Sequence, residues 1–428
     1  MTGTRSRTRR WRNWAGTESC APGTTVAARH EDDIVAAVRA AADRDHEIRV
    51  TGSGHSFNAI ACTGGVRLDL RRHRGIVSID RDAGEVTVRA GTTIGALNTA
   101  LHRAGLAVAN LGHLAGQTLG GAISTGNHGS GRTHPPLAGE VTAVRLVRGD
   151  GGVVNLTSAG GDPFRCVRTA LGVLGVLSEV TLRVRPAFRL RVTERPEPLA
   201  AVLERFAQWP EEAEHTYFSF GPDDTEVHMR HMSPVPDEPS PRAGLIRFAG
   251  TVAQVRTAAK RAGRIPSRDY VTDSRHAFTV WEPARFTACE YAFPLAGGRE
   301  VLVAVRDALA GHEPRSPYPF TVRVSAAEDA ALSLAAGRPT MYLNFAAPNT
   351  AGDVAVLRRF DAACRAHGGR PHWGKRHFAT AGDIRDRYPG WELFQRVRAV
   401  MDPDGRFVND HLRRVLGITG AGRTGRKR

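Results

Sequence analysis

The sequence predicts an α+β fold in two lobes rather than a doubly wound α/β sheet. Short strand-like and helix-like segments alternate irregularly before Pro186, which is not the regular βαβ pattern of a parallel sheet. The same region carries glycine-rich loops. None of them has the form G-x-x-x-x-G-K-[ST], or the G-x-G-x-x-G that opens a βαβ unit. A P-loop and a Rossmann fingerprint are therefore both excluded.

The elements before Pro186 follow from hydrophobic periodicity. Apolar residues at Ile34, Val35 and Val38 predict a helix over 31–44. Further predicted elements are a helix at 93–103 and strands at 47–50, 66–70, 76–79, 86–90, 141–147, 153–156 and 177–184. The glycine-rich segment 148–152, between two of these strands, predicts a hairpin.

After Pro186 the glycine loops cease, and the chain is expected to form a second domain. Its predicted strands are Leu190–Val192, Tyr217–Phe220 and Met341–Phe345, and its predicted helices are Ala200–Phe206, Val301–Ala310 and Val354–His367. Four prolines in Ser233–Arg242 predict a surface loop.

The first glycine-rich loop, Val50–Phe57, places a histidine where a predicted strand ends. Glycine allows close backbone approach, and successive N–H groups in such a turn suit phosphate oxygens. His55 adds an imidazole that can act on a bound cofactor as ligand, base or covalent attachment point. Taken alone, the loop is more typical of a tight turn that carries an ordinary polar histidine.

Two more loops favour a cofactor site. The segment Thr118–Gly131 combines many glycines with hydroxyl side chains, a composition that argues against a stable helix or a central strand. Leu171–Val176 adds two more glycines before a predicted strand. Several such loops in one domain predict an extended, phosphate-bearing cofactor lying along it.

The chain resembles the aldonolactone and alditol oxidases, a branch of the vanillyl-alcohol-oxidase flavoproteins with a PCMH-type FAD-binding domain. The stretches that carry the resemblance occur in the family's order and cover nearly the whole chain; they are Trp11–Gly16, Gly52–Phe57, Ala122–Gly131, Arg370–Lys375 and Met401–Asp410. The resemblance implies FAD, attached covalently through the histidine that matches His55.

With this resemblance in hand, we divide the folded chain into three parts. An FAD-binding domain spans 11–186, an α+β substrate (cap) domain spans 187–365, and a C-terminal segment at 366–418 returns to cover the flavin. Basic disordered tails are expected at 1–10 and 419–428. The residues assigned to FAD are Val50, Thr51, Gly52, Ser53, Gly54, His55, Ser56, Thr118, Gly121, Thr125, Gly126, Asn127, His128, Gly175, Val176 and His372.

Lysine usage points to Lys375 independently of the resemblance. The chain has three lysines among 59 basic residues, so a lysine in His372-Trp373-Gly374-Lys375 suggests a need for a compact ammonium. Chance retention on a solvated loop is the alternative. A fixed cation stabilises the negative charge that develops when a flavin accepts hydride. By the resemblance, Lys375 and Arg323 contact the substrate, and strand alternation puts Thr321 and Arg323 on one face.

Three expected substrate positions depart from the family. Thr321 stands where a carboxylate is usual, while His113 and Ala346 replace a serine and a threonine. These changes predict a more cationic pocket and argue against a simple polyol as substrate. His113 is a candidate general base and equally a hydrogen-bond donor that lines the pocket. The predicted catalytic residues are therefore Lys375, Arg323 and His113.

Gly112 bears on the electron acceptor. In the wider family a small residue at this position lets O₂ reach the flavin, which favours an oxidase; alternatively, the loop's backbone alone requires the glycine. We expect an FAD oxidase that converts a hydroxyl of a sugar-like or polyhydroxylated substrate to a carbonyl and produces H₂O₂. An FAD dehydrogenase with another acceptor and a catalytically silent ligand-binding protein stay open.

Composition limits the partners. Of the net charge of +16, residues 1–12 and 418–428 contribute nine, which leaves +7 for the folded body. No nucleic-acid-binding motif occurs, so we expect small-molecule partners and no nucleic acid. No apolar run is long enough to span a membrane. Five scattered cysteines indicate neither a disulfide framework nor a metal site, and they favour a cytoplasmic protein. We expect a monomer.

Overall fold

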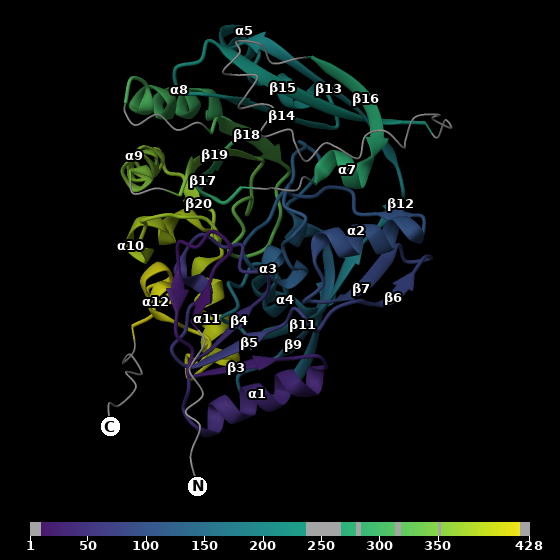
Figure 1. Ribbon diagram of the computed structural model, residues 1–428, viewed down its shortest axis with the longest axis vertical. Helices are drawn as coiled ribbons and strands as arrows, with labels where there is room; N and C mark the ends of the chain where they lie inside the picture. The colour runs from purple at the N-terminus through teal and green to yellow at the C-terminus, as the bar shows by residue number, and fades with distance from the viewer. Residues whose placement is uncertain (1–9, 237–266, 280–283, 313–317, 350–351, 420–428) are drawn as a thin grey trace.

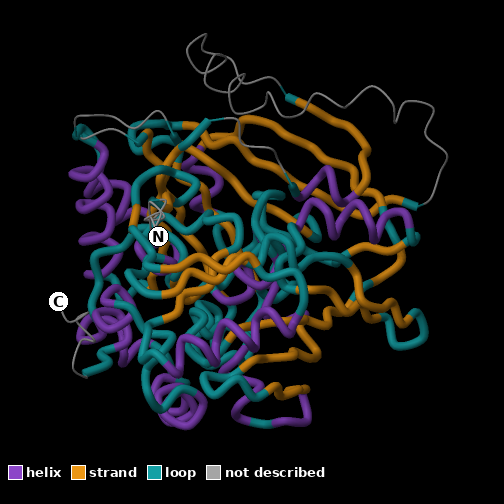
Figure 2. The backbone as a smooth tube through the Cα atoms, turned by 60° about the horizontal axis from the view of Figure 1, so that its bottom comes forward, coloured by secondary structure: helices purple, strands orange, loops and turns teal. Residues whose placement is uncertain are grey.

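The computed structural model describes residues 10–236, 267–279, 284–312, 318–349 and 352–419. Its chain forms two lobes (Figure 1). The lower lobe contains the first strands and the C-terminal helices, and the upper lobe is built on one large sheet. Loops cross the middle of the molecule between the two groups of strands (Figure 2).

The lower lobe holds two main sheets. A parallel sheet has the order β3-β5-β4, and an antiparallel sheet has the order β10-β9-β11-β7-β6. Their strands are β3 Thr24–Ala27, β4 Ile48–Thr51, β5 Val66–Asp69, β6 Ile76–Asp80, β7 Glu85–Arg89, β9 Val141–Val147, β10 Val153–Thr157 and β11 Val176–Arg183. Two small ribbons add β1 Trp11–Arg12 with β2 Ser19–Cys20, and β8 Leu106–Ala107 with β12 Arg185–Pro186.

The upper lobe is a sheet of eight strands, which we call the cap sheet, in the order β16-β13-β15-β14-β18-β19-β17-β20. Its strands are β13 Arg189–Pro198, β14 His215–Phe220, β15 Glu226–Val235, β16 Arg268–Asp273, β17 Phe286–Pro294, β18 Phe320–Ser325, β19 Thr340–Pro348 and β20 Arg370–Pro371. One face of this sheet is apolar and packs with residues of α5, α8 and α9 in a core that includes Phe218, Phe320 and Phe345. The opposite face is the polar one described below.

The helices are α1 Glu31–Asp43, α2 Ile94–Arg103, α3 Leu119–Ser124, α4 Asp162–Val167, α5 Leu199–Glu204, α7 Ser274–Phe278, α8 Gly298–Leu309, α9 Asp353–Ala366, α10 Ala381–Ile384, α11 Trp391–Met401 and α12 Asp410–Leu416. The last three return to the lower lobe (Figure 1). Buried Arg49 secures this return, since its guanidinium donates to the carbonyls of Phe407 and Leu171.

The predicted α+β class is confirmed, and most predicted elements occur within a few residues of their expected bounds. The main error is the segment Thr118–Gly131, where we expected no helix and the structure forms α3. This helix is short and buried, and Leu119 and Ile123 are fully enclosed in the core. Tertiary packing thus outweighs low helix propensity. A Cβ at Gly120 would lie 2.9 Å from the Cβ of Ala90, so close packing requires this glycine.

Two further expectations concern segments at the limits of the described residues. Strand β15 continues to Val235, so the start of the predicted proline-rich loop is strand, and its remainder from 237 lies outside the described residues. The expected disordered tails lie almost wholly outside them too. Arg10 is described, and its guanidinium donates to the hydroxyl of Ser19 at 2.8 Å.

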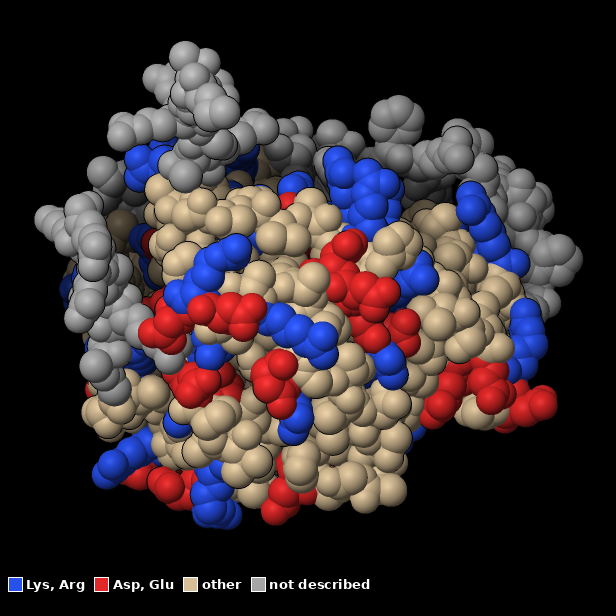
Figure 3. Space-filling model, turned by 90° about the horizontal axis from the view of Figure 1, so that it is seen from below, with Lys and Arg blue, Asp and Glu red and all other residues tan. Residues whose placement is uncertain are grey.

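The surface adds two observations. On the face seen from below, acidic side chains of the described residues are interspersed among the basic ones (Figure 3). Within the described part of the chain, no helix is both long and apolar enough to cross a membrane.

Candidate active site

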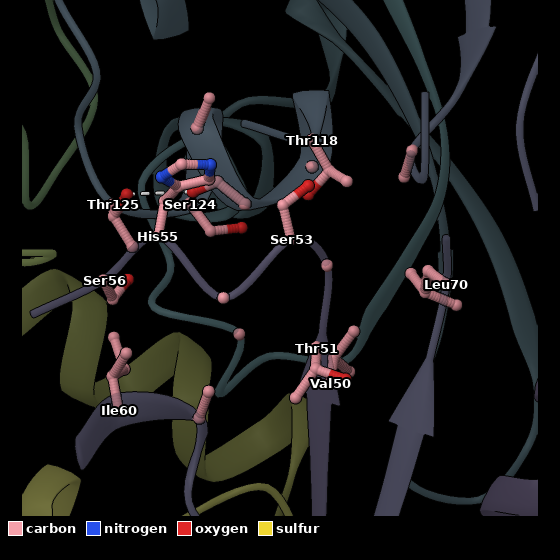
Figure 4. A pocket seen from close by; sticks show the side chains of 18 of the residues that line it. Val50, Thr51, Ser53, His55, Ser56, Ile60, Leu70, Thr118, Ser124 and Thr125 are labelled. Atoms are coloured by element: carbon pink, nitrogen blue, oxygen red, sulfur yellow. Dashed lines mark hydrogen bonds between the residues drawn. The ribbon is translucent and has the colours of Figure 1, made fainter. Parts of the chain in front are cut away.

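A cleft with about 910 Å³ of empty space, its open mouth included, lies between the loop after β4 and the start of α3, and we call it the His55 cleft. Figure 4 shows the hydroxyl side chains of Ser53, Thr118, Ser124 and Thr125 around it. Of the residues predicted to bind the cofactor, those that line it are Val50, Thr51, Gly52, Ser53, Gly54, His55, Ser56, Thr118, Gly121, Thr125 and Gly175. The lining residues come from three separate loops, which suits an extended cofactor lying along the domain.

The cleft depends on close backbone approach at glycines. A Cβ on Gly52 would lie 1.9 Å from the hydroxyl oxygen of Thr118, so no larger residue fits there unless Thr118 moves. A Cβ on Gly116 would lie 2.9 Å from Nε2 of His55. Gly54 adopts a φ of +71°, which favours glycine. These glycines therefore allow the two segments that line the cleft to pack closely.

His55 is presented to the cleft by the N-terminal segment. Trp14 stacks on its ring with centroids 4.9 Å apart, and the Trp14 N–H donates to the Gly54 carbonyl at 2.7 Å. The Nδ1 of His55 is buried and makes no hydrogen bond within the described structure. Burial lowers the pKa of His55 to about 4, so the imidazole is neutral at pH 7 and keeps a lone pair. A neutral imidazole whose Nδ1 has no hydrogen-bond partner, in a cleft lined by glycines, fits a covalent attachment to FAD.

The polar face of the cap sheet, which we call its inner face, carries the predicted substrate residues. In the antiparallel register, Ser219 lies opposite Thr321, Thr321 opposite Asn344, and Asn344 opposite Glu290. Arg323 lies two residues further along β18, between Tyr217 and Tyr342. Thr321 and Arg323 alternate in burial with their neighbours, as the strand prediction required. A row of polar side chains therefore faces away from the apolar core.

Glu290 is the centre of the charged groups in this site. Its carboxylate accepts hydrogen bonds from Nζ of Lys375 at 2.6 Å and from Nε2 of His128 at 2.7 Å. Lys375 also donates to Oδ1 of Asn344 at 2.7 Å. Burial would raise the pKa of Glu290, but the charges of Lys375 and His128 hold it well below its usual range. The carboxylate is therefore ionised and pairs with the ammonium.

Among the described residues of this face, Arg323 is a cation that forms no ion pair with a carboxylate. Its Nη2 lies 2.5 and 2.8 Å from the two ring nitrogens of His113. Its Nε is buried without a hydrogen-bond partner in the same part of the structure, and its guanidinium lies 5.3 Å from the centroid of Tyr217. We expected a more cationic pocket. Since Glu290 neutralises Lys375, the positive charge that we expected is concentrated at Arg323.

The cleft and the cap sheet meet through two loops that are far apart in sequence. The Phe57 N–H donates to the Gly374 carbonyl at 2.8 Å. The side-chain amide of Asn58 donates to the carbonyls of Trp373 and Lys375, both at 2.8 Å. The loop that carries His55 is thus joined directly to the turn that carries Lys375.

The remaining predicted residues lie around this junction or beside it. Ala346 is buried on the inner face opposite Ala288. A Cβ on Gly112 would lie 2.6 Å from Nδ2 of Asn127, whose amide donates to Gln117. His372 has its Nε2 4.0 Å from Glu290, and burial lowers its pKa to about 3. Five residues that we predicted to bind the cofactor do not line the His55 cleft: Gly126, Asn127, His128, Val176 and His372.

Sequence reasoning missed Glu290, Asn344, Asn58 and Trp14 as individual site residues. Glu290 had a usable signal, because it is the single acidic residue in the otherwise mostly apolar run Phe286–Pro294. A carboxylate in a buried strand needs a partner, and such residues mark functional sites. Asn344 and Asn58 had no comparable signal, because their roles depend on the strand register and on a contact with the distant 373–375 turn.

Two family models match the chain. The model described as D-arabinono-1,4-lactone oxidase matches residues 180–252 and 247–415, and the model described as FAD binding domain matches residues 22–157. Together they cover both lobes and the C-terminal return, and the second includes the loops that form most of the His55 cleft.

Individual relatives agree over nearly the full length. The L-gulono-1,4-lactone dehydrogenase of Mycobacterium tuberculosis is 35% identical over 95% of this chain and 99% of its own. The alditol oxidase of a Streptomyces species is 32% identical over 85% of this chain and 89% of its own. The L-gulonolactone oxidase of Mus musculus is 28% identical over 95% of this chain and 98% of its own.

Among solved structures, a solvent-stable cholesterol oxidase superposes with a TM-score of 0.79 at 20% identity, covering 96% of this chain and 98% of its own. The cholesterol oxidase of B. sterolicum gives a TM-score of 0.76 at 18% identity, covering 95% of this chain and 96% of its own. At these identities the superpositions show the fold, a PCMH-type FAD-binding domain with a cap domain. The chain belongs to the aldonolactone and alditol oxidase family of FAD-linked oxidoreductases.

Proposed function

We propose that this protein is an oxidase that converts a hydroxyl of a sugar-like, polyhydroxylated substrate to a carbonyl, with FAD bound covalently through His55. The names of the relatives make aldonolactones the first substrates to test. When bound, FAD would accept a hydride from the alcohol carbon at N5, and O₂ would then take both electrons to give H₂O₂. The residues of this chain have to bind the substrate, orient it and remove the hydroxyl proton.

The observation that carries the proposal is the position of Lys375. Its turn is bonded to the His55 loop through Asn58, and its ammonium is held by Glu290 and Asn344. These two acceptors use two of the three ammonium hydrogens, which leaves one for a substrate oxygen. A cation fixed beside the His55 cleft can stabilise charge that develops on the substrate oxygen or on the flavin.

Arg323 and His113 complete the proposed substrate site. Arg323 would hold a second substrate oxygen, since its guanidinium has donor capacity left after His113. His113 would accept the hydroxyl proton as hydride leaves, which balances the conversion of the alcohol to a carbonyl. Arg323 occupies an acceptor nitrogen of His113 in this structure, so substrate binding would have to draw the guanidinium away from the imidazole.

The electron acceptor is the point on which the relatives divide. Gly112 favours O₂ access in our proposal, whereas the relative at 35% identity is named a dehydrogenase. A dehydrogenase with another acceptor is therefore the second candidate. A silent ligand-binding protein is disfavoured because His55 and Lys375 are both present and lie at the same junction. The domain limits stated above and a cytoplasmic, monomeric protein belong to the same proposal.

Anaerobic flavin bleaching tests the function. Purified protein is mixed without oxygen with a panel of aldonolactones, alditols, aminosugars and phosphorylated sugars, and flavin absorbance is followed. We expect bleaching by a polyhydroxylated substrate, then rapid recovery of the colour with equimolar H₂O₂ when O₂ is admitted. Bleaching without recovery in O₂ would establish the dehydrogenase instead. No bleaching by any member would refute the oxidation of sugar-like hydroxyls.

A further inference from the structure

Outside the active site, two histidines and a glutamate converge where the loop after α3 meets the start of β14. His134, Glu214 and His215 each offer a ligand atom, and these atoms all lie within 4.8 Å of one another. Nε2 of His134 lies 3.1 Å from Oε1 of Glu214, and Nε2 of His215 lies 3.6 Å from the same oxygen. The two imidazole rings are nearly parallel, with centroids 4.5 Å apart.

The tautomer of His215 is set by its surroundings. Its Nδ1 lies 2.7 Å from the carbonyl oxygen of Ser130, which can only accept a hydrogen bond. Nδ1 therefore carries the proton, and in the neutral ring the lone pair is on Nε2. That nitrogen is buried and makes no hydrogen bond to the described residues, while the side chain is 0% exposed. A carbonyl bonded to the far nitrogen is the usual arrangement behind a histidine that binds a metal.

The close approach of these residues depends on the backbone conformation of Gly131. This residue has a φ of +143°, and a Cβ there would lie 2.7 Å from the Glu214 carbonyl and 2.9 Å from the His134 ring. Gly131 also pairs with Ser325 of the cap sheet, and Ala326 donates its N–H to the His134 carbonyl at 2.9 Å. The loop is therefore held against β14 and β18, with both histidines directed to Glu214.

We propose that His134, Glu214 and His215 form a binding site for one Zn²⁺ ion. Two imidazole nitrogens and a carboxylate oxygen suit zinc and other borderline divalent metals, and they are a poor set for Mg²⁺, which prefers oxygen ligands. Water would complete the coordination, since Glu214 is 28% exposed and His134 13% exposed. The sequence predicted no metal site because these ligands are scattered along the chain and include no cysteine.

Two contacts have to change when zinc binds. His134 now faces the carboxylate through Nε2, so the proton of that nitrogen moves to Nδ1 as the metal takes the lone pair. Arg185 lies 3.5 Å from Oε1 of Glu214, is 42% exposed and stacks on Phe188, so its guanidinium can leave the carboxylate for solvent while zinc replaces it as the counter-charge. The bound ion would join the loop after α3 to the cap sheet and stabilise the contact between the two lobes.

The other cluster of this kind, His128, Glu290 and His372, is not proposed as a metal site. The ammonium of Lys375 lies 2.6 Å from the Glu290 carboxylate and already supplies the positive charge that a metal would bring. The two clusters therefore predict different behaviour on zinc titration, and variants of the first cluster test the proposal without altering residues assigned to the flavin or the substrate.

The test is zinc binding by the flavin-loaded protein after removal of metals with a chelator. Equilibrium dialysis with metal analysis compares the wild type with His134→Gln and Glu214→Gln, which keep side-chain volume and hydrogen bonding. His312→Gln, at an exposed histidine at the end of α8, is the matched control. We expect one tightly bound Zn²⁺ per chain in the wild type and control, a higher melting temperature with Zn²⁺ than with Mg²⁺, and at least tenfold weaker binding in both cluster variants.

Wild-type affinity in either cluster variant would overturn the proposal, as would the absence of saturable zinc binding to the wild type. Should a variant fail to fold, X-ray absorption of the zinc-loaded wild type decides the question. The expected first shell contains two imidazole nitrogens at about 2.0–2.1 Å together with oxygen ligands. A shell that lacks histidine would show that zinc binds elsewhere.

Discussion

Nζ of Lys375 lies 2.6 Å from Oε2 of Glu290, a residue 2% exposed on the neighbouring strand β17. This contact joins the C-terminal turn to the cap sheet and fixes the ammonium on the side where the His55 loop arrives. Removing one partner of such a buried pair leaves an uncompensated charge, which is costly. The geometry of the proposed substrate site therefore depends on a carboxylate that need not touch the substrate.

Glu290→Gln should lower both stability and activity while keeping the shape of the side chain. We expect the free energy of unfolding to fall by about 3 kcal/mol, as for other broken buried pairs. Burial lowers the pKa of Lys375, and Glu290 counteracts this shift. Without the carboxylate the pKa falls further, so the ammonium is lost at lower pH. The pH profile of kcat/KM should then lose activity on its alkaline side at a lower pH than in the wild type.

The control for this prediction is Glu328→Gln, which alters a half-buried carboxyl that accepts a hydrogen bond from Ser333 rather than from Lys375. The alkaline side of the kcat/KM pH profile of Glu328→Gln should coincide with that of the wild type. An unshifted alkaline limb in Glu290→Gln would show that Glu290 does not hold the charge of Lys375. Acid stability gives a second readout, since the contribution of Glu290 is present above about pH 4.5 and is lost as pH falls through its depressed pKa in the folded protein.

His55→Ala should abolish covalent flavin attachment. The wild-type protein should remain yellow after acid precipitation, and mass spectrometry of its digest should find flavin on the peptide that contains His55. His113→Ala is the matched control, because it removes an imidazole from the same site but should leave the flavin in the pellet. A wild-type protein whose flavin is entirely extractable would rule out the covalent bond.

Gly112→Ala should slow reoxidation by O₂ more than it slows reduction by substrate. The structure adds a complication, since the new methyl would meet the amide of Asn127. Stopped-flow reoxidation of Gly112→Ala is therefore compared with Asn127→Ala and with the double variant, in which the methyl has room. If Gly112 is the oxygen gate, the double variant stays slow. Fast reoxidation in the double variant would assign the effect to displacement of Asn127.

Simple polyols should be poor substrates of the wild type. Thr321 lacks the family carboxylate, and Ala346 and His113 lack the usual hydroxyls. A lost polar contact costs about 1–3 kcal/mol, or roughly ten- to a hundredfold in kcat/KM. The triple variant Thr321→Glu, His113→Ser, Ala346→Thr should raise kcat/KM for xylitol and sorbitol relative to the native substrate. Efficient oxidation of both polyols by the wild type would show that these positions do not set specificity.

The sequence predicted what local periodicity and composition control. Alternation placed Thr321 and Arg323 on one face, and the rarity of lysine singled out Lys375. The glycine-rich start of α3 was wrongly excluded from a helix because propensity says nothing of the buried neighbours that stabilise it. The partners of Lys375 and the His134–Glu214–His215 cluster depend on strand register and on contacts between distant segments, which periodicity does not contain.

The most direct test of the central claim is the anaerobic rate of flavin reduction in Lys375→Met and Lys375→Arg, with the substrate found by the bleaching panel. Both variants should keep the flavin on His55, because Lys375 is held by Glu290 and Asn344 rather than lining the His55 cleft. We predict that Lys375→Met reduces its flavin about a hundred- to a thousandfold more slowly than the wild type. Lys375→Arg should restore little, since a planar fork does not replace a compact ammonium. Flavin reduction in Lys375→Met at the wild-type rate would contradict the proposed active site.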